Sequence, residues 1–240
     1  IGYYVGNLKG NSHEYPYKTP MEILIEASNG ASDYGNKMGE PLIGGFTRSF
    51  GMGHYEYIKP VLYSAGNGYI FKEHLLKEIP VEGLIVVRIG GGAYKIGLGG
   101  GSCSSRSQDT KNNEADFNAV QRGNPEMENR VCRFIRTCAE MGRKNPIKTI
   151  HDQGSGGMAN VTKELVYPVG ADISLDKVIL GDSALGAFEI WNAEYQEQCS
   201  FLINEADVDS CRKIAEREHV PIAFIGKTRN DGVIHVVYKD

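Results

Sequence analysis

The stretch IKTIHDQGSGGMANVTKEL, residues 147–165, decides the fold expected for this chain. Residues 148–150 predict a short buried strand, which ends in the polar pair His151–Asp152 and a glycine turn at residues 154–157. An amphipathic run from Met158 onward predicts a helix. This order brings a carboxylate and backbone N–H groups to a helix N-terminus, where they suit a metal and a phosphate.

A second glycine cluster, GLGGGSCSS at residues 97–105, offers another surface of backbone N–H groups. Two such clusters in one chain predict a phosphorylated ligand. The cluster is neither G-x-G-x-x-G before a helix nor a P-loop with its Lys-Ser/Thr ending, so neither nucleotide fingerprint is present in its usual form. Asp152 also fits a plain capping carboxylate, and His151 fits a hydrogen-bonded structural histidine better than a base.

The composition indicates an ordinary soluble globular chain of the cytoplasm. Hydrophobic residues make up 41% and charged residues 23% of the 240 residues, enough for two modest domains or one large one. The formal net charge of −4 gives no basic surface for nucleic acid or an anionic membrane, and no apolar run approaches the about 20 residues of a membrane helix. Five scattered cysteines without a C-x-x-C pair favour reduced thiols over disulfides or zinc.

Strands and helices alternate along the chain with few tight hairpins, which predicts an α/β or α+β fold. The predicted strands are residues 3–5, 41–50, 57–65, 84–89, 148–150, 188–195, 199–203, 222–226 and 233–238. The predicted helices are residues 21–37 with a break at Asn29–Gly30, 124–144, the run from Met158, and 207–219. A proline and a closing glycine at residues 80–83 place a domain boundary there.

Three further polar positions are candidates for ligand contacts. The block Glu194–Glu197 follows an apolar segment with the only tryptophan, Trp191; Gln121 precedes a helix start, and Arg48 follows a glycine pair. An exposed strand edge, a hydrogen bond within a loop and a solvated arginine explain the same residues equally well. These residues by themselves indicate a cytosolic α/β chain that binds a phosphorylated metabolite.

Five blocks of the sequence together resemble the phosphoribosylformylglycinamidine synthase family, the large amidotransferases of purine biosynthesis. The blocks are EASNGASDYGNKMGEPLIGGFTRSFG (26–51), IGLGGGSCSSR (96–106), DFNAVQRGNPEMENR (116–130), IHDQGSGGMANVTKEL (150–165) and FEIWNAEYQE (188–197). They occur in the family's order and cover most of the chain. Their spacing most resembles the first synthase half of the large single-chain form.

The resemblance implies an aminoimidazole ribonucleotide synthetase-like α/β (α+β) fold, with an incomplete N-terminal domain at residues 1–83 and a C-terminal α/β domain at residues 84–240. It implies an ATP-dependent ligase that converts formylglycinamide ribonucleotide to formylglycinamidine ribonucleotide, with ammonia taken from glutamine. ATP and magnesium are the implied cofactors, and the rest of the synthase with its glutaminase domain is the implied partner. The family's upstream histidine motif and glutaminase are missing, so we expect a piece of a larger protein that is inert alone.

Carried onto matching positions, the resemblance makes Asp152 the magnesium carboxylate and names no catalytic residue. The other residues that it implies are substrate contacts at Gln121, Glu194, Tyr195 and Gln196, and a nucleotide-contacting turn at Gly44, Gly45 and Phe46. Cys103 and Ser155 stand where the family has alanine, and both changes are too small to alter the chemistry.

Two other interpretations stay open. One is a related ribonucleotide synthetase of the same superfamily, against which the NAEYQE block argues. The other is a non-catalytic paralogue that binds nucleotide as a sensor or scaffold, against which the intact Asp152 and Gln121 argue.

Overall fold

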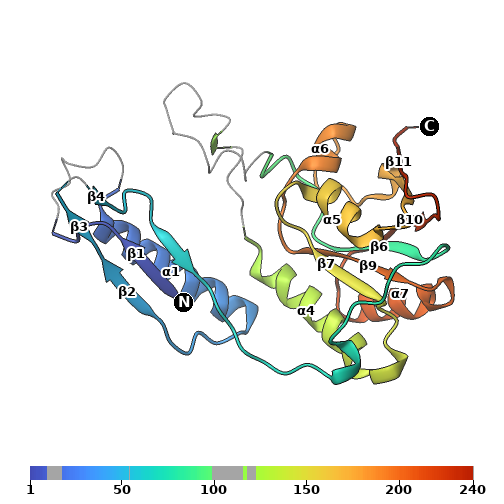
Figure 1. Ribbon diagram of the computed structural model, residues 1–240, viewed down its shortest axis with the longest axis horizontal. Coiled ribbons are helices and arrows are strands. Elements are labelled where there is room, and N and C mark those ends of the chain that lie inside the picture. Colours follow the sequence, from blue (N-terminus) through green and yellow to red (C-terminus); the bar gives the residue numbers. More distant parts are fainter. Residues whose placement is uncertain (10–17, 54, 99–115, 118–122, 240) are drawn as a thin grey trace. The chain divides into compact units, whose positions relative to one another are not determined.

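The computed structural model divides the chain into two compact units, Ile1–Tyr69 and Ile70–Asp240 (Figure 1). The residues that it describes are 1–9, 18–53, 55–98, 116–117 and 123–239. The sequence places a boundary later, near Gly83, but the segment before that glycine bonds to the second unit. The backbone N–H of Glu78 donates to the carbonyl of Lys148 over 3.1 Å. The division into family domains at residue 83 stays a prediction.

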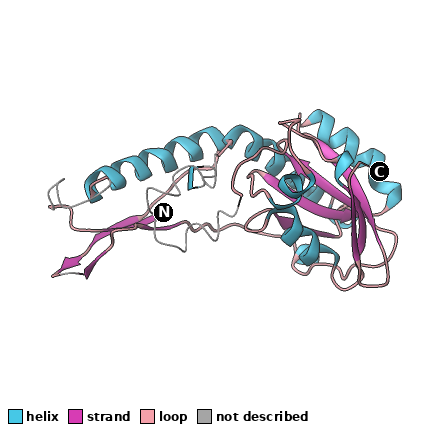
Figure 2. Ribbon diagram, turned by 90° about the horizontal axis from the view of Figure 1, so that it is seen from above, coloured by secondary structure: helices cyan, strands magenta, loops and turns pink. Residues whose placement is uncertain are grey.

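The first unit is a small sheet with one helix along one face (Figure 2). Its elements are β1 (Gly2–Val5), α1 (Pro20–Met38), β2 (Phe46–Ser49), β3 (Gly51–Met52), β4 (Tyr55–Glu56) and β5 (Val61–Tyr63). The strand order is β2-β1-β5, in which β1 is parallel to β2 and antiparallel to β5; β3 and β4 form a separate pair. Tyr3 and Val5 are buried, and the Tyr3 hydroxyl donates to the carbonyl of Ala27 in α1.

Three predictions in the first unit need correction. Helix α1 runs without a break through Asn29–Gly30, because its capping box at Thr19 and its left-handed C-cap at Gly39 lie outside that pair. The predicted strand 41–50 is shorter, since only Phe46–Ser49 pairs with β1, along the whole of that strand. The predicted strand 57–65 is reduced to β5, which begins directly after Pro60.

The second unit is a six-stranded mixed sheet with helices on both faces. Its helices and strands are β6 (Ile85–Gly90), α4 (Pro125–Glu140), β7 (Thr149–Asp152), α5 (Gly157–Val166), β8 (Ala171–Ser174), α6 (Ala187–Asn192), β9 (Gln198–Ile203), α7 (Val208–Arg217), β10 (Ile222–Thr228) and β11 (Ile234–Val237). The strand order is β11-β8-β10-β6-β9-β7, and every neighbouring pair is antiparallel except β11 with β8. This sheet and its helices confirm the predicted α/β (α+β) class.

Side chains alternate across this sheet and form two hydrophobic clusters, one on each face. The cluster on the α5 and α6 face includes Val86, Met158, Leu165, Ile190, Leu202 and Ile225. The cluster on the α4 and α7 face includes Val87, Phe134, Cys138, Phe201 and Cys211. The strands between the clusters are therefore apolar on both faces, so a polar side chain inside them is an exception.

Most of the predicted elements of the second unit are confirmed, with ends shifted by a few residues. Helix α4 begins as the sequence predicts, because the Asn124 side chain accepts the backbone N–H of Met127 over 3.1 Å and Pro125 follows it. The predicted strand 188–195 is wrong, because most of it is α6. The Glu189 carboxylate accepts the N–H of Gly186 and starts that helix. Strand β8 was not predicted.

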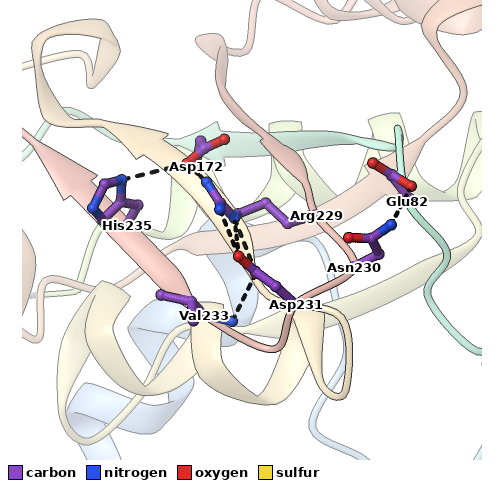
Figure 3. Close-up of polar contacts among 7 residues, drawn as sticks. All are labelled: Glu82, Asp172, Arg229, Asn230, Asp231, Val233 and His235. Atoms are coloured by element: carbon purple, nitrogen blue, oxygen red, sulfur yellow. Dashed lines mark hydrogen bonds and ion pairs between the residues drawn. The ribbon is translucent and has the colours of Figure 1, made fainter.

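The connection from β10 to β11 crosses over β8, which lies between them in the sheet. Arg229 holds this connection, donating from Nη1 to Asp172 Oδ1 over 2.6 Å and from Nε to Asp231 over 3.0 Å (Figure 3). This exposed ion network sits at the edge of the sheet farthest from β7. Within the described ranges, no helix is long and apolar enough to cross a membrane.

Candidate functional site

Three described glycines of the second unit pack against one loop, residues 193–197, between α6 and β9. We call it the 193–197 loop. A Cβ atom added to any of three glycines would collide with a carbonyl oxygen of this loop, namely Gly90 at 2.1 Å from Glu197, Gly97 at 2.7 Å from Glu194, and Gly157 at 2.6 Å from Ala193. These glycines therefore allow close backbone packing against the loop. The phosphate surface predicted for the clusters of Gly97 and Gly157 stays a prediction.

Glu194 is the carboxylate that meets the glycine turn before α5. It is 5% exposed, and its Oε1 accepts the backbone N–H of Gly156 over 2.9 Å. Gly156 is the N-cap of α5 and has no side chain to cap the helix, so a carboxylate from the 193–197 loop supplies the negative charge that a helix N-terminus favours. The capping interpretation of Asp152 is therefore wrong.

Asp152 instead ends β7 with an exposed side chain. Its side chain is 86% exposed, and its Oδ1 lies 3.4 Å from His151 Nδ1. His151 itself pairs with Glu164 of α5, as expected of a structural histidine. Among the described residues no three His, Cys, Asp or Glu side chains form a metal site. A single exposed carboxylate fits magnesium, which keeps several waters and takes one or two carboxylates with substrate phosphates.

Tyr195 and Gln196 line a cavity of about 290 Å³. Its walls are the turn after β6, the start of α4 and the 193–197 loop, through Gly91, Gly92, Tyr94, Ile96, Asn124, Met127, Tyr195, Gln196 and Glu197. The Tyr195 ring is almost fully buried, whereas Gln196 is exposed. The cavity thus combines apolar walls with a few polar groups, the usual character of a small-molecule site.

Asp152 and the 193–197 loop lie at the same end of the sheet. The backbone N–H of Gln153, which follows Asp152, donates to the carbonyl of Gln198 over 3.0 Å. Three carboxylates, those of Glu128 on α4, Glu197 and Asp152, lie close enough at this end of the sheet to interact electrostatically. Burial raises the pKa of Glu128, and the negative charges of Glu197 and Asp152 raise it further. A cation near Asp152 would relieve this repulsion.

The structure brings only part of the predicted site together. Glu194, Tyr195 and Gln196 share the 193–197 loop, with Asp152 at the same end of the sheet. Gln121 lies outside the described residues. The turn at residues 44–46 belongs to the first unit, where the carbonyl of Gly44 accepts the amino group of Ile1 over 2.8 Å. That turn lines a separate cavity of about 480 Å³ between α1 and the sheet.

Sequence reasoning missed two buried residues beneath the cavity. Arg88 is 1% exposed in the middle of the apolar strand β6, and its guanidinium carbon lies 5.0 Å from the centroid of the Tyr195 ring. Gln153 donates from Nε2 to the carbonyl of Tyr195 over 3.3 Å. An arginine inside the apolar run LIVVRI was the one available signal, because a buried strand rarely contains a charge.

A model of the family described as AIR synthase related protein, C-terminal domain, matches residues 81–239. The chain belongs to this family. The AIR synthase-related match covers nearly all of the second unit, including Asp152, the 193–197 loop and the strands that hold them. The first unit lies outside the match.

Relatives of known name agree with this assignment. The chain is 48% identical to "Phosphoribosylformylglycinamidine synthase" of Dictyostelium discoideum over 259 residues, which is 100% of this chain and 19% of that protein. It is 47% identical to "Probable phosphoribosylformylglycinamidine synthase, chloroplastic/mitochondrial" of Arabidopsis thaliana, over 96% of this chain and 18% of that protein. The chain thus spans about a fifth of the length of these relatives.

Solved structures share the fold of this AIR synthase-related chain. "T. maritima PurL complexed with FGAR" superposes with a TM-score of 0.76 at 22% identity, over 99% of this chain and 36% of that one. "T. maritima PurL complexed with ATP" gives a TM-score of 0.71 at 19% identity, over 99% of this chain and 35% of that one. The coverage includes both units, so the first unit also has a counterpart in this fold.

Proposed function

We propose that this chain is the part of a phosphoribosylformylglycinamidine synthase that holds the ribonucleotide substrate. The whole protein would convert formylglycinamide ribonucleotide to formylglycinamidine ribonucleotide with ATP and with ammonia from glutamine. The relatives that are 47–48% identical carry this name, which favours it over another ribonucleotide synthetase of the superfamily. The rest of the synthase and its glutaminase domain would be the partners of this chain.

One observation supports the substrate role above the others. Three of the four residues predicted as substrate contacts, Glu194, Tyr195 and Gln196, lie on a single loop into which three glycines pack. Two of the three line the cavity of about 290 Å³. A loop held this tightly presents its side chains in one geometry, which lowers the entropy lost when a ligand binds.

The described residues suggest a division of labour. Glu194 would hold the loop against the start of α5, while the exposed carboxamide of Gln196 would bond to the substrate. Asp152 would hold magnesium, which neutralises phosphate charge when bound. Gly44, Gly45 and Phe46 would contact the nucleotide in the first unit. In the whole enzyme ATP would activate the amide oxygen of the substrate, and ammonia would then displace phosphate.

Location in the cytoplasm is also a proposal. The composition favours reduced thiols, and the described cysteines Cys132, Cys138, Cys199 and Cys211 are free in the structure. The Arabidopsis relative is named as chloroplastic/mitochondrial, so the location of this chain requires direct imaging of a tagged protein.

Calorimetric titration of the full-length protein with formylglycinamide ribonucleotide, with and without magnesium, tests this function. We expect binding that strengthens with magnesium, and we expect Asp152→Ala to remove that gain and abolish turnover. The fold should survive the substitution, because the side chain is exposed.

Glu140→Ala is the matched control, since Glu140 is an exposed carboxylate at the end of α4 and outside the site. Normal turnover in Asp152→Ala would refute the metal assignment. Failure of the wild-type protein to bind the ribonucleotide at all would refute the substrate.

A further inference from the structure

Arg88 is a buried charge within strand β6. Among the described residues no carboxylate lies within ion-pair distance of its guanidinium, although buried charges in proteins are normally paired. Because an arginine stays protonated in proteins, the charge must be stabilised by other groups. Burial lowers the pKa of Arg88, consistent with this cost.

The two groups that stabilise Arg88 belong to opposite walls of the cavity. Nη2 donates to the carbonyl of Gly91 over 2.8 Å, and the guanidinium lies over the Tyr195 ring. Gly91 comes from the turn after β6, and Tyr195 comes from the 193–197 loop. Both residues line the cavity of about 290 Å³. A single side chain therefore joins the two walls from beneath.

The buried polar side chains around Arg88 have donors and acceptors that make no hydrogen bond within the described part of the chain. Strand register puts these side chains on one face, since Arg88 is opposite Ser200 on β9 and Gln198 lies two residues earlier on that strand. Both amide atoms of buried Gln198 have no partner among the described residues. Arg88 Nε, Gln153 Oε1 and the Tyr195 hydroxyl belong to side chains that lie close together, yet these atoms make no hydrogen bond of ordinary geometry there. Such atoms are rare in folded proteins, and core filling does not explain five of them together.

We propose that Arg88 is a positioning residue, which ties the turn at residues 90–92 to the 193–197 loop and so fixes the distance between the two walls that receive the ligand. Arg88 acts through Gly91 and Tyr195 and does not itself touch the substrate. The planar guanidinium is suited to this role, because it can donate to a carbonyl and stack on an aromatic ring at once. The identity of the ligand in this proposal rests on the proposed function.

Two substitutions in the full-length protein test the proposal. Arg88→Met removes the charge and the donors; Arg88→Lys keeps the charge but cannot bond Gly91 and cover Tyr195 together. With ammonium as nitrogen donor, we expect the KM for formylglycinamide ribonucleotide to rise about threefold in Arg88→Lys and about tenfold in Arg88→Met, with kcat nearly unchanged, as for lost uniform binding.

Hydrogen–deuterium exchange supplies a readout that needs no substrate. We expect the exchange rate of peptides covering residues 90–97 and 193–198 to increase from wild type to Arg88→Lys to Arg88→Met. The rate in Arg88→Met should be about ten times that in wild type. Val87→Ala is the matched control, because Val87 is also fully buried on β6 but faces the α4 and α7 cluster.

Equal exchange and equal KM values in both Arg88 variants and Val87→Ala would overturn the proposal, since Arg88 would then contribute only to general stability. If Arg88→Met does not fold, Arg88→Lys decides by itself. A wild-type KM and wild-type exchange of the 193–197 loop in that variant would overturn the proposal. If wild-type protein shows no turnover, the proposed function fails, while the exchange series still decides the role of Arg88.

Discussion

The two units use their apolar side chains in opposite ways. In the second unit they form two clusters, one on each face of a sheet that helices cover on both sides. In the described part of the first unit only Tyr3 and Val5 are buried hydrophobic residues, while Phe46 is 42% and Tyr55 is 75% exposed. Since burial of apolar surface drives folding, most of the stability of this chain belongs to the second unit.

The first unit has a helix on one face of its sheet and an aromatic surface on the other. The Tyr4 ring lies within 5.7 Å, centroid to centroid, of the rings of Phe46, Tyr57 and Tyr63. Aromatic pairs contribute about 0.5–1.5 kcal/mol each beyond area burial. They organise the surface without enclosing it, so only the face toward α1 is covered in the described part of the unit.

Truncation of a core phenylalanine should separate the two units most clearly. Phe134 is fully buried, and its ring centroid is 5.6 Å from that of Phe201. Phe134→Ala should lower the free energy of unfolding of the second unit by about 3–5 kcal/mol, whereas Phe46→Ala should cost the first unit about 1 kcal/mol. Urea titration followed by fluorescence reports the second unit, because the only tryptophan is Trp191.

Hydrogen exchange of residues 1–9 and 18–53 supplies the matching measurement for the first unit. Equal losses from the two substitutions would mean that Phe46 belongs to a core, and the contrast between the units would be wrong.

Glycine substitutions sharpen the comparison, because a glycine lies tightly against a carbonyl oxygen in each unit. A Cβ atom at Gly90 would lie 2.1 Å from the oxygen of Glu197, at a φ of 116°, and one at Gly45 would lie 1.9 Å from the oxygen of Ile1. Gly90→Ala should destabilise by about 3 kcal/mol, because positive φ and a fixed loop leave no room to relax.

Gly45→Ala should cost less, since the φ of Gly45 lies outside the left-handed region and an alanine adds no backbone strain there. Thermal denaturation of both variants measures the difference, and exchange of residues 193–198 should increase only in Gly90→Ala. A larger loss in Gly45→Ala would show that the first unit depends on the position of Ile1.

The two units should differ least in how much stability they lose at acidic pH. The Arg229 guanidinium lowers the pKa of Asp231 to about 2, and hydrogen bonds from Thr19 lower the pKa of Glu22 in the first unit. A depressed folded-state pKa contributes stability that is present above the unfolded value, about 3.9 for Asp, and is lost as pH falls through the folded value.

Both carboxylates are exposed to solvent, so screening keeps the effects small. Asp231→Asn should reduce the loss of stability between about pH 4 and pH 2, with Glu22→Gln as the counterpart in the first unit. Denaturant titrations at each pH measure the free energy of unfolding. If that free energy falls with pH as steeply in Asp231→Asn as in wild type, the ion network does not contribute to acid-sensitive stability.

Local signals in the sequence determined the regular elements that have a clear period or cap. Asn124 and Pro125 placed the start of α4, and the apolar stripe of α7 placed that helix, because these features act within a few residues. The glycine turn before α5 was located in the same way. The segment 188–195 was predicted wrongly, since six helical residues are too few to distinguish the helical period from a short apolar strand.

The family and the loop with Glu194, Tyr195 and Gln196 were also accessible from the sequence, through five blocks in a fixed order. The tertiary structure alone decided what the glycines and the buried charge do. Gly90 and Gly97 lie far in the sequence from Gly157 and from residues 193–197, and only the tertiary structure brings all three glycines against that loop. Likewise Arg88 meets Gly91 and Tyr195 from one position, a long-range arrangement that no local pattern encodes.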